Sequence, residues 1–212
     1  MKPQVSVLFA AALALAAPGF AAAATQATDT CVPTKLVDTR AALRDLWLGH
    51  IFWVRNVVDA QFAGDVSAAN TAEQQVVANA QAIAGAVEPY YGKAASDQLF
   101  TLLAGHWGAV RDYLNATRSG STTGQDAAFK QLADNAGEIA TFLSGANPNW
   151  PVDTLRGLLT AHGSHHVKQI QQFQAKQYEE EAKTWSAMTS HMYVIADALA
   201  AGLAKQFPEK FQ

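Results

Sequence analysis

A short motif ending in histidine occurs three times in the chain at a fixed spacing. It reads LWLGH at 46–50, LLAGH at 102–106 and LLTAH at 158–162. The histidines therefore lie 56 residues apart in both intervals. Self-similarity at a constant period indicates an internally repeated fold. Because 56 residues are eight heptads, a helical stripe that starts in register also stays in register.

A second set of polar residues follows the same period. Its members alternate with the three histidines along the chain, and each is followed four residues later by an isoleucine. They are Asn79, Asn135 and His191, with Ile83, Ile139 and Ile195 after them. Both sets fall on apolar stripes with helical spacing, so we expect their side chains to face the interior.

The positions of turn-forming residues predict how the repeats fold. In an antiparallel hairpin, residues equidistant from the turn lie at the same height. Midpoints between successive members of the two sets fall on Gly64-Asp65, Gly92, Gly120-Ser121 and Pro148-Asn149. The sequence therefore predicts an all-α, antiparallel up-down bundle of about six helices, built from three 56-residue hairpins. One layer would then hold His50, Asn79, His106, Asn135, His162 and His191.

The last hairpin lacks a comparable turn signal. Its midpoint falls on Lys176-Gln177, and residues 174–180 are rich in Ala, Lys, Gln and Glu, which favour helix. By analogy with the other hairpins we expect a turn near 174–179. A single continuous helix is the alternative that local propensity favours.

The N-terminal segment is typical of an exported protein. A lysine at position 2 precedes an apolar run at 5–17, and several A-x-A cleavage sites follow at 21–24. We therefore expect a signal peptide over 1–24, a flexible leader over 25–33, and a single bundle domain over 34–212. The predicted location is periplasmic or secreted. Cys31 is the only cysteine, so no internal disulfide can form.

Charge and composition exclude several classes of function. The net charge is −3, and the basic residues are scattered rather than gathered in a stripe. We therefore expect no nucleic-acid partner. After signal cleavage no apolar run is long enough for stable membrane insertion. No nucleophile pattern and no glycine-rich phosphate loop occurs, so the sequence gives no positive sign of an enzyme.

The histidines of the predicted layer suggest a metal site. Burying an unpaired imidazole costs about 1–3 kcal/mol, so several in one layer need a shared partner. Neutral imidazole is the commonest metal ligand and suits Zn, Cu or Ni. The predicted ligands are His50, His106, His162 and His191. Asn79 and Asn135 are predicted to orient the rings. A haem with two axial histidines is a less favoured variant.

Other interpretations remain open. A closed polar network could fix helix register without binding metal, which would make the chain a structural or interaction module whose protein partner is unknown. His165 and His166 could add ligands, but they have no counterparts in the other repeats, so we expect both to be peripheral. Arg55 and Arg111 each follow a layer histidine by five residues. They could hold an anion, although surface arginines are the favoured interpretation.

Several longer segments carry a family resemblance. They are LWLGHIFWVR at 46–55, LLAGH at 102–106, NAGEIATFLS at 135–144, NPNWP at 147–151 and HMYVIADALAAGLAKQFPEKF at 191–211. In these the chain resembles a family of small, largely uncharacterised bacterial helical proteins. Some relatives are named acetylglutamate kinase, a name this sequence does not support because it has no phosphate loop. The resemblance implies a repeated helical fold and supplies no activity.

Overall fold

The computed structural model describes residues 33–212. The expected signal peptide and nearly all of the expected leader lie outside the described residues. The described residues form one compact unit. Within residues 33–212, no helix is long and apolar enough to cross a bilayer.

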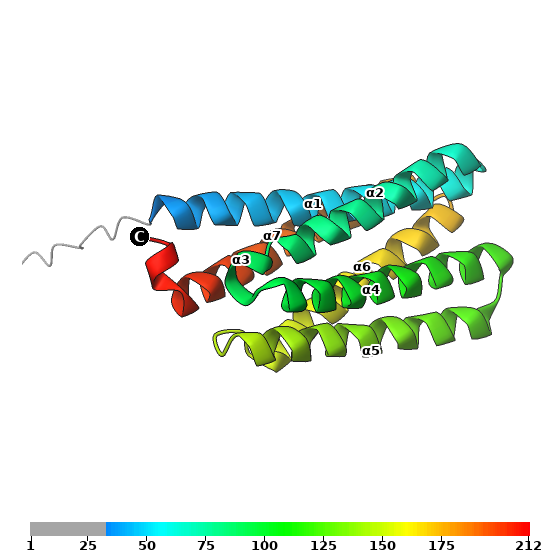
Figure 1. The fold of residues 1–212 in the computed structure, drawn as a ribbon. Coiled ribbons are helices and arrows are strands. Elements are labelled where there is room, and N and C mark those ends of the chain that lie inside the picture. The colour runs from blue at the N-terminus through cyan, green and yellow to red at the C-terminus, as the bar shows by residue number, and fades with distance from the viewer. Residues whose placement is uncertain (1–32) are drawn as a thin grey trace, which may run out of the picture. The chain divides into compact units, whose positions relative to one another are not determined.

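Six long helices make up the described chain, in agreement with the predicted all-α bundle (Figure 1). They are α1 (Thr34–Ala63), α2 (Val66–Gly85), α4 (Lys93–Ser119), α5 (Thr122–Ala146), α6 (Val152–Gln174) and α7 (Tyr178–Gln206). A four-residue helix, α3 (Glu88–Tyr91), lies in the second connection, and a 3₁₀ turn, η1 (Pro208–Lys210), follows α7. Residues 33–212 contain no strand.

The helices pair as the sequence predicts, in three consecutive hairpins. These are α1 with α2, α4 with α5, and α6 with α7. The hairpins join side by side, since α2 packs on α4, α5 packs on α6, and α7 returns to α1. In addition α6 contacts both α1 and α4 across the interior. The first helix of each hairpin, which carries the repeated histidine, is thus brought toward the other two.

The three hairpin turns share one conformation. In each, a left-handed residue lies one or two positions after the end of the first helix, and the next amide donates back to a carbonyl five residues earlier at 2.9 Å. This is the Schellman motif, for which glycine is the usual left-handed residue. The left-handed residues are Gly64, Gly120 and Lys176, with φ of 77°, 71° and 56°. The turn predicted near 174–179 is therefore confirmed, and it keeps the 56-residue period with a lysine in place of glycine.

The residue after each left-handed position is the N-cap of the next helix. Asp65 accepts a hydrogen bond from the Ala68 amide, and the Ser121 hydroxyl accepts one from Gly124. Gln177, at the third equivalent position, makes no side-chain cap. Asp and Ser are preferred at this position because their oxygens satisfy a free amide of the first turn. The third turn therefore lacks both local signals that mark the first two.

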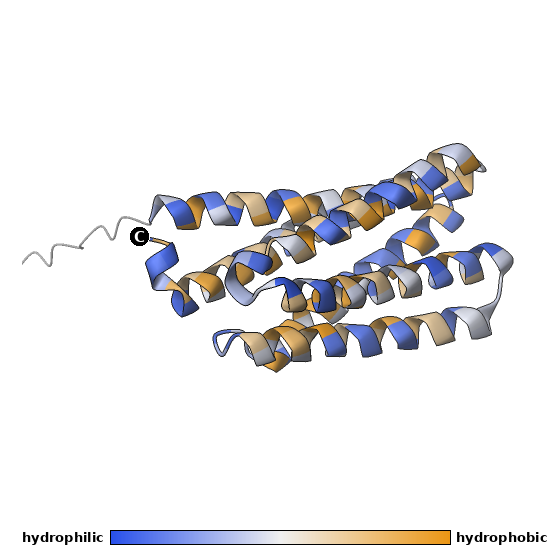
Figure 2. Cartoon of the chain, in the orientation of Figure 1, coloured by the Kyte–Doolittle hydropathy of each residue, from blue (hydrophilic) through white to orange (hydrophobic). Residues whose placement is uncertain are grey.

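The apolar core lies in two regions along the bundle, and the repeated histidines fall between them. One region includes Trp47, Leu99 and Ile139. The other includes Val57, Val110 and Phe173. Figure 2 shows hydrophilic and hydrophobic residues alternating along each long helix, as amphipathic helices require when one face is buried.

Candidate metal site

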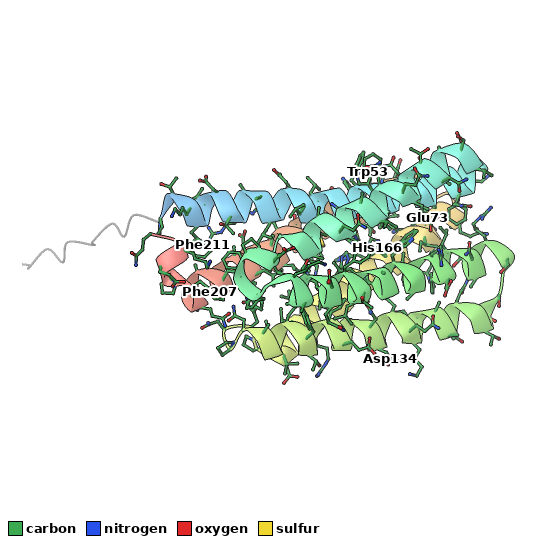
Figure 3. The ribbon with its side chains drawn as sticks, viewed as in Figure 1. Trp53, Glu73, Asp134, His166, Phe207 and Phe211 are labelled. Carbon is green, nitrogen blue, oxygen red and sulfur yellow. The ribbon has the colours of Figure 1, made fainter. Side chains whose placement is uncertain are left out.

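Four buried histidines meet in the interior of the bundle. They are His50 from α1, His106 from α4, and His162 and His166 from α6. Each offers a ring nitrogen, and these four atoms all lie within 4.8 Å of one another. None of the four residues is more than 5% exposed. Figure 3 labels His166, which lies between the helices rather than on their outer side.

The rings are spaced as ligands of one ion would be. His50, His106 and His162 form a triangle with ring centroids 5.3, 5.4 and 6.0 Å apart. His166 caps this triangle at 4.5, 5.6 and 6.2 Å from the three. Two imidazoles on a tetrahedral zinc ion, with Zn–N bonds of 2.0–2.1 Å, have centroids about 5.2 Å apart. The observed separations lie on both sides of this value, so small ring movements would bring all four nitrogens to one ion.

The hydrogen bonds of the cluster are incomplete. The Nε2 atoms of His50 and His162 lie 3.2 Å apart, close enough for one to donate to the other. Both ring nitrogens of His106, Nδ1 of His162 and Nε2 of His166 are buried without a partner among the described residues. A buried polar atom left unpaired costs about 1–3 kcal/mol. These four nitrogen atoms therefore either destabilise the metal-free protein or bind a ligand.

Burial keeps the four imidazoles neutral. It lowers the pKa of His50 to about 3, with His106 adding to the effect, and it lowers the pKa of His106 to about 4. Burial also lowers the pKa values of His162 and His166 well below the usual value, and the neighbouring histidines add to the effect. Neutral imidazole is the form that binds a metal. The cluster therefore needs no deprotonation to accept an ion near neutral pH.

The repeat explains three of the four positions. His50, His106 and His162 occupy the same place on the first helix of each hairpin, so the packing of those helices brings them together. His166 follows His162 by one helical turn and shares its face. The equivalent positions in the first two repeats are Val54 and Val110, which are also buried.

The second periodic set has a different role from the one predicted. Asn79 and Asn135 donate from Nδ2 to the carbonyls of Leu46 and Leu102, each at 3.0 Å. His191 places Nε2 2.8 Å from the carbonyl of Leu158. Each acceptor lies four residues before a cluster histidine, so the three contacts fix the height of the second helix in each hairpin against the first. All six predicted residues thus contribute to one layer, in two different ways.

The structure reverses the positions predicted for His191 and His166. His191, predicted as the fourth ligand, lies outside the cluster because its ring is directed to the backbone of α6. His166, predicted to be peripheral, is in the cluster. Asn79, predicted to orient a ring, instead bonds the backbone of α1. Asn135 does the same on α4, and its side chain also lies near enough to the His106 ring to raise the pKa of that imidazole against the effect of burial.

Small residues beside the histidines allow these contacts. A Cβ on Gly49 would lie 2.9 Å from Nδ2 of Asn79, and one on Gly105 would lie 3.2 Å from Nδ2 of Asn135. The third repeat has Ala161 at this position and His191 as the donor, so both members of the pair differ together. The glycine before each of the first two histidines is therefore the sequence signal for a side chain that docks on the backbone.

The two arginines near the layer are occupied by carboxylates rather than by a free anion. Arg55 makes a two-pronged pair with Glu181 at 2.7 and 2.6 Å, and Gln169 donates to the same carboxylate at 2.8 Å. Arg111 contacts Glu73 at 3.0 Å, and Trp107 donates to the same oxygen at 3.1 Å. Glu181 is only 1% exposed, although nothing in its acidic sequence context indicates burial.

Comparison of the chain with protein-family models, with curated proteins and with solved structures finds no match.

Proposed function

We propose that the protein binds one divalent transition-metal ion with His50, His106, His162 and His166 as its ligands. The observation that carries the proposal is the meeting of four buried imidazoles whose ring nitrogens lie within 4.8 Å of one another. A single ion at the centre would use one nitrogen from each ring. It would also satisfy buried atoms that hydrogen bonds leave unpaired.

The coordination expected of this site favours zinc. A triangle of rings capped by a fourth approximates a tetrahedron, and zinc accepts tetrahedral ligand sets because its filled d shell imposes no other geometry. Cu(II) and Ni(II) prefer square-planar or tetragonal ligands, so we expect them to bind with more distortion. Haem does not fit, because centroids 4.5–6.2 Å apart leave no room for a macrocycle among the rings.

The role proposed for the protein is sequestration, delivery or sensing of the ion rather than catalysis. Catalytic zinc sites hold three protein ligands and keep a position for water, whereas four protein ligands make a closed shell. The rings are also almost fully buried, so a substrate would have no approach to the ion. Together with the predicted signal peptide, this suggests a periplasmic or secreted protein that sequesters, delivers or senses a transition metal.

Zinc titration of untagged, chelator-treated protein tests the proposal. We expect one tight event, with the metal content of the purified protein measured in parallel. His166→Val places at this position the residue found at 54 and 110. We expect this substitution to lower the affinity for zinc by about 10–100-fold or more. That range is the effect of removing a hydrogen-bond partner of a ligand, and His166→Val removes a ligand itself. The double change Ala161→Gly and His191→Asn reproduces the first two repeats. It keeps the tight event if His166 is the fourth ligand and loses it if His191 is.

One observation favours a second candidate function. The close approach of His50 and His162, at 3.2 Å between their Nε2 atoms, is also what a metal-free polar layer would use to set helix register. In that case the chain would be a structural or interaction module. The same titration decides between the two, because the module would show no tight zinc event and no zinc-dependent rise in melting temperature.

A further inference from the structure

Two histidines remain outside the buried cluster, and they lie next to each other. The chain has six histidines, of which His165 on α6 and His191 on α7 are not among the four cluster residues. Their ring centroids are 5.4 Å apart, with the planes at 56°. This separation is close to the roughly 5.2 Å of two imidazoles on one tetrahedral ion.

The hydrogen bond of His191 fixes which of its nitrogens is free. A backbone carbonyl only accepts, so Nε2 must carry the proton that it donates to the oxygen of Leu158 at 2.8 Å. In the neutral ring Nδ1 then keeps its lone pair. A ring whose other nitrogen donates to a carbonyl is the usual arrangement of a metal-bound histidine, because the hydrogen bond fixes the tautomer and orients the ring.

His165 has a matching unpaired atom. Its Nδ1 is buried without a partner among the described residues, although the residue itself is only partly buried. His165 directly precedes the cluster ligand His166, and successive residues of a helix point about 100° apart. One ring therefore lies at the boundary of α6 and α7, while the next is directed into the bundle.

The buried cluster needs a route from solvent, since none of its residues is more than 5% exposed. We propose that His165 and His191 form a second, more accessible site, which takes up the same class of divalent transition-metal ion on its way to the buried four-histidine site. This rests on the proposed function for the identity of the ion. Two imidazoles supply two ligands, and water completes the shell. Lys168, exposed and close enough for its charge to act on the His165 ring, weakens the binding of a cation. The site should therefore be weaker than the buried one, as transfer requires.

Two variants test the pair, and the first of them copies the other two repeats. Asn79 and Asn135 make with an amide the backbone contact that His191 makes with a ring. The double change Ala161→Gly and His191→Asn should therefore keep the hydrogen bond to Leu158 while removing Nδ1 of the ring. His165→Gln removes the other ligand without changing α7. Agreement between two variants on different helices separates loss of a ligand from local misfolding.

The measurement is a titration of the untagged, chelator-treated protein with Zn²⁺ by calorimetry, followed by imidazole NMR signals. We expect two events in the wild type, one tight and one weak, with the weak event shifting the signals of His165 and His191. Each variant should lose the weak event and keep the tight one. With Co²⁺ as the probe, the absorption of the tetrahedral buried site should then appear more slowly than in the wild type.

Three results would overturn the inference. The first is that Zn²⁺ leaves the NMR signals of His165 and His191 unshifted in the wild type. The second is that either variant still shows both binding events in calorimetry. The third is that both variants load Co²⁺ into the buried site as fast as the wild type does. Failure of the proposed function is a separate outcome, because it removes the tight event, which His166→Val tests without touching the pair.

Discussion

Replacing His106 by Leu should reverse the order of stability between metal-free and metal-bound protein. His106 is 3% exposed, and neither of its ring nitrogens has a partner among the described residues. Leucine has a similar size and no polar atom. Because a buried unpaired group costs about 1–3 kcal/mol, we expect the metal-free variant to be more stable than the wild type by about that amount.

Zinc should have the opposite effect. An ion present at a thousand times its dissociation constant stabilises the folded state by about 4 kcal/mol. The wild type gains this free energy, and we expect the variant to lose most of it together with one of four ligands. The wild type should therefore be less stable than His106→Leu in chelator and more stable in zinc.

Urea unfolding of both proteins, in chelator and in excess zinc, measures the four free energies of unfolding. Thr117→Val is the matched control, because Thr117 is also buried on α4 and its hydroxyl already donates to the Tyr113 carbonyl. Its effect should be the same in both conditions. If the two wild-type curves superimpose at neutral pH, no metal contributes and the proposal fails. If His106→Leu destabilises the metal-free protein, the unpaired nitrogens are not the cost that the structure indicates.

Four further outcomes are expected. Lys176→Gly should stabilise the fold by about 1–2 kcal/mol in urea unfolding, because a non-glycine residue pays that much to be left-handed; an unchanged midpoint would contradict the turn. Gly202→Ala should destabilise by about 1–3 kcal/mol because its Cβ would overlap the Trp150 indole. Gly157→Ala, with open space around it, should instead stabilise by up to about 1 kcal/mol. The metal-free protein should lose about 2 kcal/mol for each of His50 and His106 between pH 7 and 5, since their folded pKa values of about 3 and 4 lie below the unfolded 6.5. The unfolded chain takes up protons first, so this stability is present above pH 6.5 and lost as pH falls, and His106→Leu should flatten the profile.

The height of each residue in the bundle could be predicted from the sequence. Two residues equidistant from a turn face each other whatever the detailed packing, so the period and the glycines were enough to place the layer. The same reasoning located the third turn, where local propensity gave the wrong indication. Lys176 adopts the left-handed conformation because the hairpin closes there, and tertiary packing outweighs a local cost of about 1–2 kcal/mol.

The direction of each side chain within the layer could not be predicted in the same way. Register fixes how high a residue lies, whereas the rotation of its helix decides whether it faces the bundle axis or a neighbouring backbone. The first helix of each hairpin directs its histidine to the axis, while the second directs Asn79, Asn135 or His191 to the helix beside it. Gly49 and Gly105 indicate which residues face a neighbouring backbone, because a glycine beside the histidine leaves space for the side chain of Asn79 or Asn135.

The absence of His166 from the other repeats led to the wrong prediction, although symmetry makes that absence expected. Three equivalent helices place three equivalent histidines in a triangle. The proposed tetrahedral site needs a fourth ligand that caps this triangle, where three copies of one side chain would occupy the same space. Only one repeat can therefore supply it, and the equivalent positions hold Val54 and Val110, which are buried apolar residues. Val110→His in the wild type should accordingly destabilise the protein without adding a ligand. The pair Val110→His and His166→Val should restore the zinc affinity that His166→Val alone lowers. Failure of that rescue in a folded double variant would show that only α6 can supply the capping histidine.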